Sequence, residues 1–159
     1  MHPKKPLASY IDHTLLKPDA TAEQVKKICA EAREYNFASV CVNPSRIALV
    51  AQELKGTDVL PCCVVGFPLG AIPSESKAAE TAVAIRNGAK EIDMVINIGA
   101  AKEGDWSYVQ KDIAAVVRES EAQRIVVAMS GDTGFYSGAK TLLPLLQDLH
   151  PTVLPGVSS

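Results

Sequence analysis

Four polar side chains lie inside or at the ends of apolar segments, and they are the first candidates for chemistry. Asp93 lies in EIDMVINI, and Asp12 lies in the earlier segment YIDHTLLKP. Asn43 and Asn97 stand at the ends of two apolar runs. An ionised carboxylate in a dry layer must be paired, shifted in pKa or used, so Asp93 and Asp12 are candidates for proton transfer.

Each candidate also has a purely structural interpretation. Hydrogen bonds from a neighbouring loop could hold the Asp93 carboxylate, and Asn43 and Asn97 could be turn residues. In parallel α/β folds, however, the carboxyl ends of the strands face the ligand crevice, so polar residues collected there indicate a site. Both interpretations stay open at the level of the sequence.

The elements that must position these residues alternate along the chain. Apolar runs predict strands, and amphipathic runs between them predict helices that begin at capping residues or at proline. The strands are expected at 11–14, 38–43, 59–67, 91–98, 124–129 and 152–155, and the helices begin near Thr21, Pro44, Ser74, Asp105 and Phe135.

The predicted strands are apolar throughout rather than alternating, so both of their faces are buried, as in a parallel sheet covered by helices. We predict an α/β fold with a parallel β-sheet of five to six strands and flanking helices. Two arrangements are open. One is an open, doubly wound, flavodoxin-like sheet, and the other is a partial barrel derived from half a TIM barrel, which shields its edge by pairing with another copy.

The length, charge and hydropathy of the chain exclude several classes of protein. With 159 residues the chain is expected to form a single domain over 1–159. A net charge of -2 and a pI near 5.9 exclude the basic surface that nucleic acids or anionic membranes require. No apolar run approaches the roughly 20 residues of a membrane span, and the first ten residues do not resemble a signal peptide, so we expect a cytoplasmic protein.

The four cysteines, Cys29, Cys41, Cys62 and Cys63, show no paired CxxC spacing, and the histidines are scattered. We interpret these cysteines as small buried hydrophobic residues. The sequence therefore predicts no metal site and no disulfide.

Four motifs carry a family resemblance: YIDHTLLKPDAT, FASVCVNPSRI, VVGFPLG and EIDMVINIGAAKEGDW. In order and spacing, over about residues 7–120, they resemble the first half of the deoxyribose-phosphate aldolases. That family is a TIM barrel that cleaves 2-deoxyribose 5-phosphate to acetaldehyde and glyceraldehyde 3-phosphate through a lysine Schiff base, with no cofactor. The resemblance implies that Asp93 belongs to the proton relay, that Asp12 is a site aspartate and that Cys41 lies near the substrate.

The last segment resembles a different family. SGDTGFYSGAKTLLPLL followed by LPGVSS is similar to tetrapyrrole methylases, in particular the precorrin and cobalt-precorrin methyltransferases. Over about residues 122–159 this resemblance implies that Gly131 and Asp132 lie beside S-adenosylmethionine. We therefore interpret the chain as a chimera, with an aldolase-like half barrel over 1–121 and a methylase-like strand-helix-strand over 122–159.

The aldolase family carries its Schiff-base lysine in a Lys-Thr-Ser-Thr-Gly run that this sequence lacks. A free lysine has a pKa of about 10.4, so burial or a nearby cation must lower the pKa before the amine can attack an aldehyde. The sequence thus favours a composite, engineered scaffold without efficient catalysis. The alternative is a class I aldolase that cleaves 2-deoxyribose 5-phosphate.

The ligands and partners expected from the sequence follow from the two resemblances. A sugar phosphate or S-adenosylmethionine is expected at low affinity, and further copies of the chain are expected to pair through open sheet edges. Neither nucleic acid nor membrane is expected as a partner.

Overall fold

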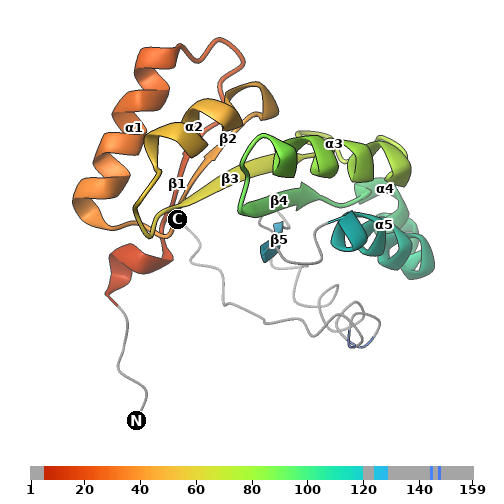
Figure 1. The fold of residues 1–159 in the computed structure, drawn as a ribbon. Helices are drawn as coiled ribbons and strands as arrows, with labels where there is room; N and C mark the ends of the chain where they lie inside the picture. The colour runs from red at the N-terminus through yellow and green to blue at the C-terminus, as the bar shows by residue number, and fades with distance from the viewer. Residues whose placement is uncertain (1–5, 120–123, 129–143, 145–146, 148–159) are drawn as a thin grey trace.

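The computed structural model describes residues 6–119, 124–128, 144 and 147 (Figure 1). Five strands in the described residues form one sheet in the order β1-β2-β3-β4-β5, and every neighbouring pair is parallel. The strands are β1 (Asp12–Leu15), β2 (Ser39–Val42), β3 (Leu60–Val65), β4 (Glu91–Val95) and β5 (Arg124–Ala128). The predicted strand at 152–155 lies outside the described residues.

Helices connect these strands. They are α1 (Ala22–Tyr35), α2 (Ile47–Glu53), α3 (Ser74–Arg86), α4 (Ile98–Glu103) and α5 (Trp106–Glu119), with 3-10 helices η1 (Leu7–Tyr10) and η2 (Pro44–Arg46). The predicted capping box is confirmed at the start of α1, where Thr21 and Gln24 cap each other's backbone amides at 2.9 and 3.3 Å. No helix in the described part of the chain is long and apolar enough to cross a lipid bilayer.

The strand order decides between the two predicted arrangements. In a doubly wound sheet the strand order reverses at a switch point, and helices cover both faces. Here the order is sequential, and right-handed crossovers between successive parallel strands place the connecting helices on one side of the sheet (Figure 1). The doubly wound, flavodoxin-like alternative is therefore wrong, and the described strands have the singly wound order of a TIM-barrel segment.

The two faces of the sheet differ in chemistry because successive side chains of a strand point to opposite faces. One face packs on the helices and forms the main core with Val25 of α1, Val50 of α2 and Ile113 of α5. Its strand residues are Val40, Val42, Cys63, Val65, Ile92 and Met94. The alternate strand positions form a separate small cluster of Cys41, Cys62 and Val64 on the other face.

Two predicted boundaries are corrected by tertiary contacts. Ser74 does not cap α3, because it is the first residue of the helix and its hydroxyl donates instead to Asp112 Oδ1 at 2.8 Å. The strand predicted over 91–98 ends at Val95, because Asn97 caps the short helix α4 by accepting from the Ala100 amide at 3.0 Å. The predicted helix from Phe135 lies outside the described residues apart from positions 144 and 147.

Candidate functional site

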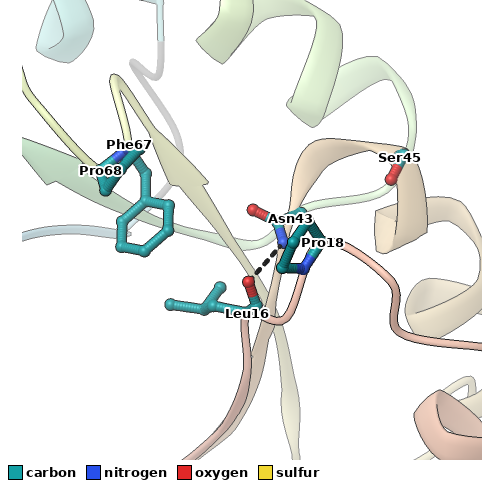
Figure 2. A pocket seen from close by; sticks show the side chains of 6 residues that line it. All are labelled: Leu16, Pro18, Asn43, Ser45, Phe67 and Pro68. Carbon is teal, nitrogen blue, oxygen red and sulfur yellow. Dashed lines mark hydrogen bonds between the residues drawn. The ribbon is translucent and has the colours of Figure 1, made fainter.

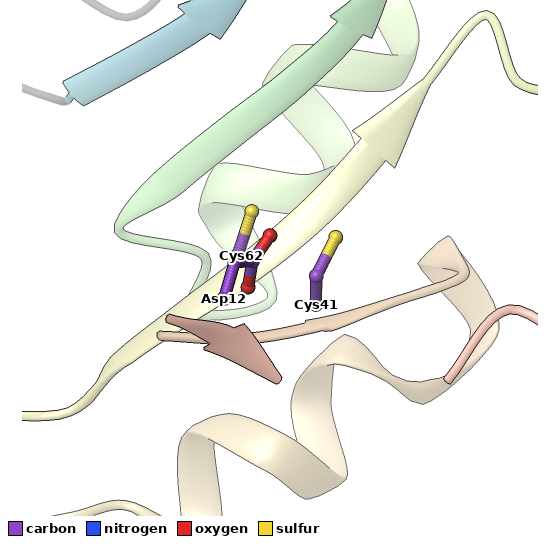
Figure 3. A group of neighbouring side chains, drawn as sticks. All are labelled: Asp12, Cys41 and Cys62. Atoms are coloured by element: carbon purple, nitrogen blue, oxygen red, sulfur yellow. The ribbon is translucent and has the colours of Figure 1, made fainter. Parts of the chain in front are cut away.

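The face of the sheet opposite the main core brings together residues from three adjacent strands. Asp12 of β1, Cys41 of β2 and Cys62 of β3 place a carboxylate oxygen and two sulfurs within 4.8 Å of one another (Figure 3). Both thiols are fully buried, whereas Asp12 remains accessible at the edge strand. Two of the three residues, Asp12 and Cys41, are sites expected from the sequence.

Asp12 is held by its neighbour on β2. The Ser39 hydroxyl donates a hydrogen bond to Asp12 Oδ1 at 2.6 Å, and the two residues are partners in the strand register. Burial of the carboxyl raises the pKa of Asp12 above its ordinary value, although hydrogen bonds from Ser39 and Cys41 lower it. Asp12 is therefore an oriented carboxylate whose burial partly opposes its charge.

Asp93 lies on the same face of β4, two residues beyond Glu91. Burial, together with the negative charge of Asp12, raises the pKa of Asp93 to about 6. A carboxyl group with a pKa near neutrality can both accept and release a proton under physiological conditions. Asp93 thus has the acid-base properties that a proton relay requires.

The thiols divide between the two faces. On the open face, the pKa of Cys62 is raised by its hydrogen bond with Cys41, by burial and by nearby negative charge. On the helix side, burial raises the pKa of Cys29 to about 11 and that of Cys63 to about 12. Sequence spacing treats the four cysteines alike, but the strand alternation separates Cys41 and Cys62 from the residues of the main core.

A cavity of about 410 Å³ opens at the carboxyl ends of β1, β2 and β3 (Figure 2). Its lining contains no charged side chain and consists of Leu16, Pro18, Asn43, Ser45, Phe67 and Pro68. Asn43 Nδ2 donates to the Leu16 carbonyl at 3.0 Å and so joins the ends of β1 and β2. The predicted position of Asn43 beside a crevice is in keeping with this cavity.

The loop between β3 and α3, which carries Phe67 into the cavity, is held by α3 and by the chain just after β4. The Gly66 amide donates to Glu80 Oε2 at 2.8 Å. Gly70 has φ +64, and a Cβ there would collide with the carbonyl oxygen of Ile96. Glycine is needed at position 70 both for its left-handed conformation and for the close approach of the two backbones.

Asn97, the other predicted polar strand end, has a structural role. Its side chain caps α4, and its backbone amide donates to Asp112 Oδ2 at 3.1 Å. Gly131 and Asp132, predicted from the methylase resemblance, lie outside the described residues. The structure therefore brings together Asp12, Cys41 and Asp93 on one face, while Asn97 is engaged elsewhere.

The sequence interpretation missed a buried ion pair close to this loop. Lys77 and Asp112 are both fully buried, and Lys77 Nζ donates to Asp112 Oδ2 at 2.5 Å. Helical spacing could have revealed the lysine, because Lys77, Thr81 and Ala84 are the buried residues of α3 and follow an i, i+4, i+7 pattern. The pair joins α3 to α5 and is structural.

The similarity to known aldolases extends past the predicted chimera junction between residues 121 and 122. The DeoC/LacD family aldolase model matches residues 7–133. The deoxyribose-phosphate aldolase of Clostridium tetani is 60% identical over 120 residues, which cover 76% of this chain and 56% of that protein. The chain spans about half the length of the curated relatives it matches.

Two solved structures share the fold over most of the chain. An aldolase called QR15 aligns with a TM-score of 0.79 at 28% identity, covering 87% of this chain and 62% of that one. The deoxyribose phosphate aldolase of Aeropyrum pernix, described as having a unique tetrameric structure, aligns with a TM-score of 0.60 at 26% identity, covering 89% and 73%.

These findings correct the chimera interpretation. The aldolase family match continues to residue 133 and so crosses the predicted junction into the first part of the segment assigned to a methylase, 122–133, and β5 pairs in parallel with β4 as the next strand in order. The described strands therefore continue one winding across the predicted junction. A composite scaffold without catalysis, and an S-adenosylmethionine site at Gly131 and Asp132, have no support from these comparisons.

Proposed function

The chain belongs to the DeoC/LacD family of aldolases, and we propose that it functions in class I aldol chemistry, cleaving 2-deoxyribose 5-phosphate to acetaldehyde and glyceraldehyde 3-phosphate. The observation that carries this proposal is the gathering of Asp12, Cys41 and Asp93 on one face of the sheet, below a cavity at the strand ends. Relatives named deoxyribose-phosphate aldolase support the choice of substrate.

The described residues account for proton transfer in this reaction. Cleavage through an imine needs a base for the substrate hydroxyl and an acid for the enamine carbon that forms when the carbon–carbon bond breaks. In the proposal Asp93 serves both steps, because burial and, to a smaller extent, the charge of Asp12 raise its pKa to about 6. Cys41 is fully buried beside Asp12.

The cavity suits the carbon chain of the substrate more than its phosphate. The walls are Leu16, Pro18, Phe67 and Pro68, with polar contacts available from Asn43 and Ser45, and none of these six side chains is charged. Phosphate groups in TIM barrels are commonly held by the loops after the seventh and eighth strands. The proposal therefore assigns the aldehyde-bearing end of the substrate to this cavity.

The test is acetaldehyde release from 2-deoxyribose 5-phosphate, measured by coupled NADH oxidation. We expect Asp93→Asn to lower the rate by about 10² to 10⁴ because general acid-base catalysis contributes that much. Asp58→Asn is the matched control, because Asp58 is exposed before the amino end of β3 and should leave the rate unchanged. No release by the unaltered chain, or an unimpaired Asp93→Asn variant, would contradict the proposal.

Borohydride trapping identifies the lysine that forms the imine. The chain is incubated with acetaldehyde and reduced, and intact mass followed by peptide mapping locates the adduct. We expect a two-carbon adduct on one lysine. Lys17 is the first lysine to examine because it is exposed and stands between the cavity residues Leu16 and Pro18, whereas Lys77 is fully buried against Asp112. Adducts spread evenly over several lysines would argue against a Schiff-base site.

We also propose that copies of the chain associate through the edge of β1. No described strand pairs with the outer edge of β1, and Leu7, Tyr10 and Ile11 beside it are 75%, 59% and 38% exposed. Sedimentation velocity should show a species larger than a monomer, and Leu7→Asp should weaken it. A monomer at every concentration would refute this association.

The single-domain organisation over 1–159 also remains a prediction.

A further inference from the structure

A cluster of one carboxylate and two thiols lies on the open face of the sheet, and it shares Asp12 and Cys41 with the proposed aldolase site. Asp12, Cys41 and Cys62 bring their ligand atoms within 4.8 Å of one another, and they come from three adjacent strands (Figure 3). We propose that these three side chains bind one thiophilic divalent cation, of the class of Zn²⁺ or Cd²⁺. This inference goes beyond the proposed function and does not depend on it.

The donor set favours such ions. Thiolates select soft metals, and a carboxylate can complete a three-ligand zinc site whose fourth position holds water. With Zn–S near 2.3 Å and Zn–O near 2.0–2.2 Å, tetrahedral ligand atoms lie about 3.5–4 Å apart. The ligand atoms lie within 4.8 Å of one another, so they must draw slightly closer together to form a tetrahedral site.

The backbone holds the ligands in place. Cys41 and Cys62 are directly opposite one another in the parallel register of β2 and β3, so the separation of their Cβ atoms is set by the sheet. The fully buried Ser39 donates to Asp12 Oδ1 at 2.6 Å and so holds the carboxylate beside the two sulfurs. Such hydrogen bonds to a ligating carboxylate fix its orientation.

The charges around the thiols favour a cation. Glu91 is the register partner of Cys62, and its negative charge and that of Asp12 both act on this thiol. Asp93 adds a third carboxylate on β4. On binding, the metal forms bonds to two sulfurs and one carboxylate oxygen, and the two thiol protons are released to solvent.

Binding has a consequence for the site described above. The ion takes up Asp12 and Cys41, which lie beside Asp93 in the proposed aldolase site. It also offsets the negative charge that Asp12 exerts on Asp93. The cation and the aldolase substrate are therefore expected to compete.

The experiment is a Cd²⁺ titration of the reduced, metal-free 159-residue chain, followed by the ultraviolet absorption of cadmium thiolates. The sequence contains four cysteines, so the signal can arise only from Cys29, Cys41, Cys62 or Cys63. We expect saturation at one Cd²⁺ per chain, displacement by Zn²⁺ and no effect of Mg²⁺. Cys41→Ser and Cys62→Ser should each weaken binding at least tenfold and reduce the signal to that of one thiolate.

Cys63→Ser is the matched control. Cys63 follows Cys62 on the same strand and is equally buried, but it belongs to the helix-side core, where its sulfur lies 3.5 Å from the Val64 carbonyl oxygen. This variant should keep the full signal. An absence of saturable absorption, an unchanged signal in Cys41→Ser and Cys62→Ser, or an equal loss in Cys63→Ser would overturn the proposal.

A second variant keeps the test decisive if the serine variants do not fold, as judged by circular dichroism. Asp12 is accessible, so Asp12→Asn should fold and should bind Cd²⁺ about tenfold more weakly while keeping both thiolate bonds. Unchanged affinity in Asp12→Asn would reject the three-ligand site. These readouts measure binding, so they are independent of whether the chain cleaves 2-deoxyribose 5-phosphate.

Discussion

Two groups of charged side chains lie within this fold, and their surroundings differ. Lys77 and Asp112 are fully buried, joined at 2.5 Å, and supported by hydrogen bonds from the Ser74 hydroxyl and the Asn97 amide. Asp12 and Asp93 lie on the opposite face of the sheet, and the charge of Asp12 helps to raise the pKa of Asp93 to about 6.

This difference indicates that the Lys77–Asp112 pair has a structural role, whereas Asp12 and Asp93 are available for proton transfer. The Asp112 carboxylate contacts the Lys77 ammonium and accepts from two further donors, so this pair joins α3 to α5. A carboxylate beside another carboxylate keeps a proton up to a higher pH and can exchange it near neutrality. The first arrangement fits a packing role, and the second fits proton transfer.

The largest effect on stability is expected from removing one partner of the Lys77–Asp112 ion pair. Asp112→Ala leaves the buried Lys77 ammonium without its partner, so we expect a loss of about 3–5 kcal/mol in the free energy of unfolding, measured by urea denaturation. Lys77→Met combined with Asp112→Leu should cost less than Asp112→Ala, because no unpaired charge remains.

Lys27→Ala is the surface control for that experiment. Lys27 is 76% exposed and lies 3.9 Å from Glu31, so its removal should change the free energy of unfolding by under about 0.5 kcal/mol. Equal losses in Lys27→Ala and Asp112→Ala would mean that the buried pair has no special role.

Substitution of Asp93 is expected to stabilise the protein, in contrast to substitution of Asp112. The pKa of Asp93 is raised from 3.8 to about 6 on folding, so its contribution to stability is fully present below pH 3.8 and is lost as the pH rises through about 6. Asp93→Asn should therefore stabilise the protein above pH 6, by about 1 kcal/mol once partial solvent exposure is allowed for.

Urea denaturation at pH 7.5 and again at about pH 4 checks this sign. The advantage of Asp93→Asn should be mostly lost at the lower pH, where the carboxyl is protonated in the folded state and partly protonated in the unfolded state. Asp58→Asn, at an exposed position, should show no such pH dependence. Destabilisation by Asp93→Asn at pH 7.5 would mean that Asp93 is held by partners in its charged form.

The smallest effect concerns the coupling between the two aspartates. Asp12→Asn removes one of the two causes that raise the pKa of Asp93, and burial, the larger cause, stays. We therefore expect the Asp93 pKa to fall by less than one unit, measured by NMR titration of its carboxyl carbon. An unchanged pKa would show that the two carboxylates do not interact.

The sequence predicted part of this arrangement from local patterns. The Thr21 capping box and the Asp105 cap of α5, which accepts from the Tyr108 amide at 3.0 Å, depend on residues three positions apart and were predicted correctly. Ser74 was assigned wrongly as a cap because its partner, Asp112, is 38 residues away. The spacing of the cysteines likewise gave no indication that Cys41 and Cys62 meet, since they lie on different strands.

The aldolase motifs and the apolar strands were sufficient to identify the family, the α/β class and the candidate residues Asp12, Cys41 and Asp93. The sequence alone led to a wrong junction near residue 121. Two short motifs resembled another family, and the continuous strand order that contradicts a junction is not visible in the sequence. Tertiary structure decided the single-sided winding, the separation of the thiols between two faces and the pairing of Lys77 with Asp112. The physical reason is that secondary structure and caps depend on near neighbours, whereas strand order and buried charge depend on residues that only folding brings into contact.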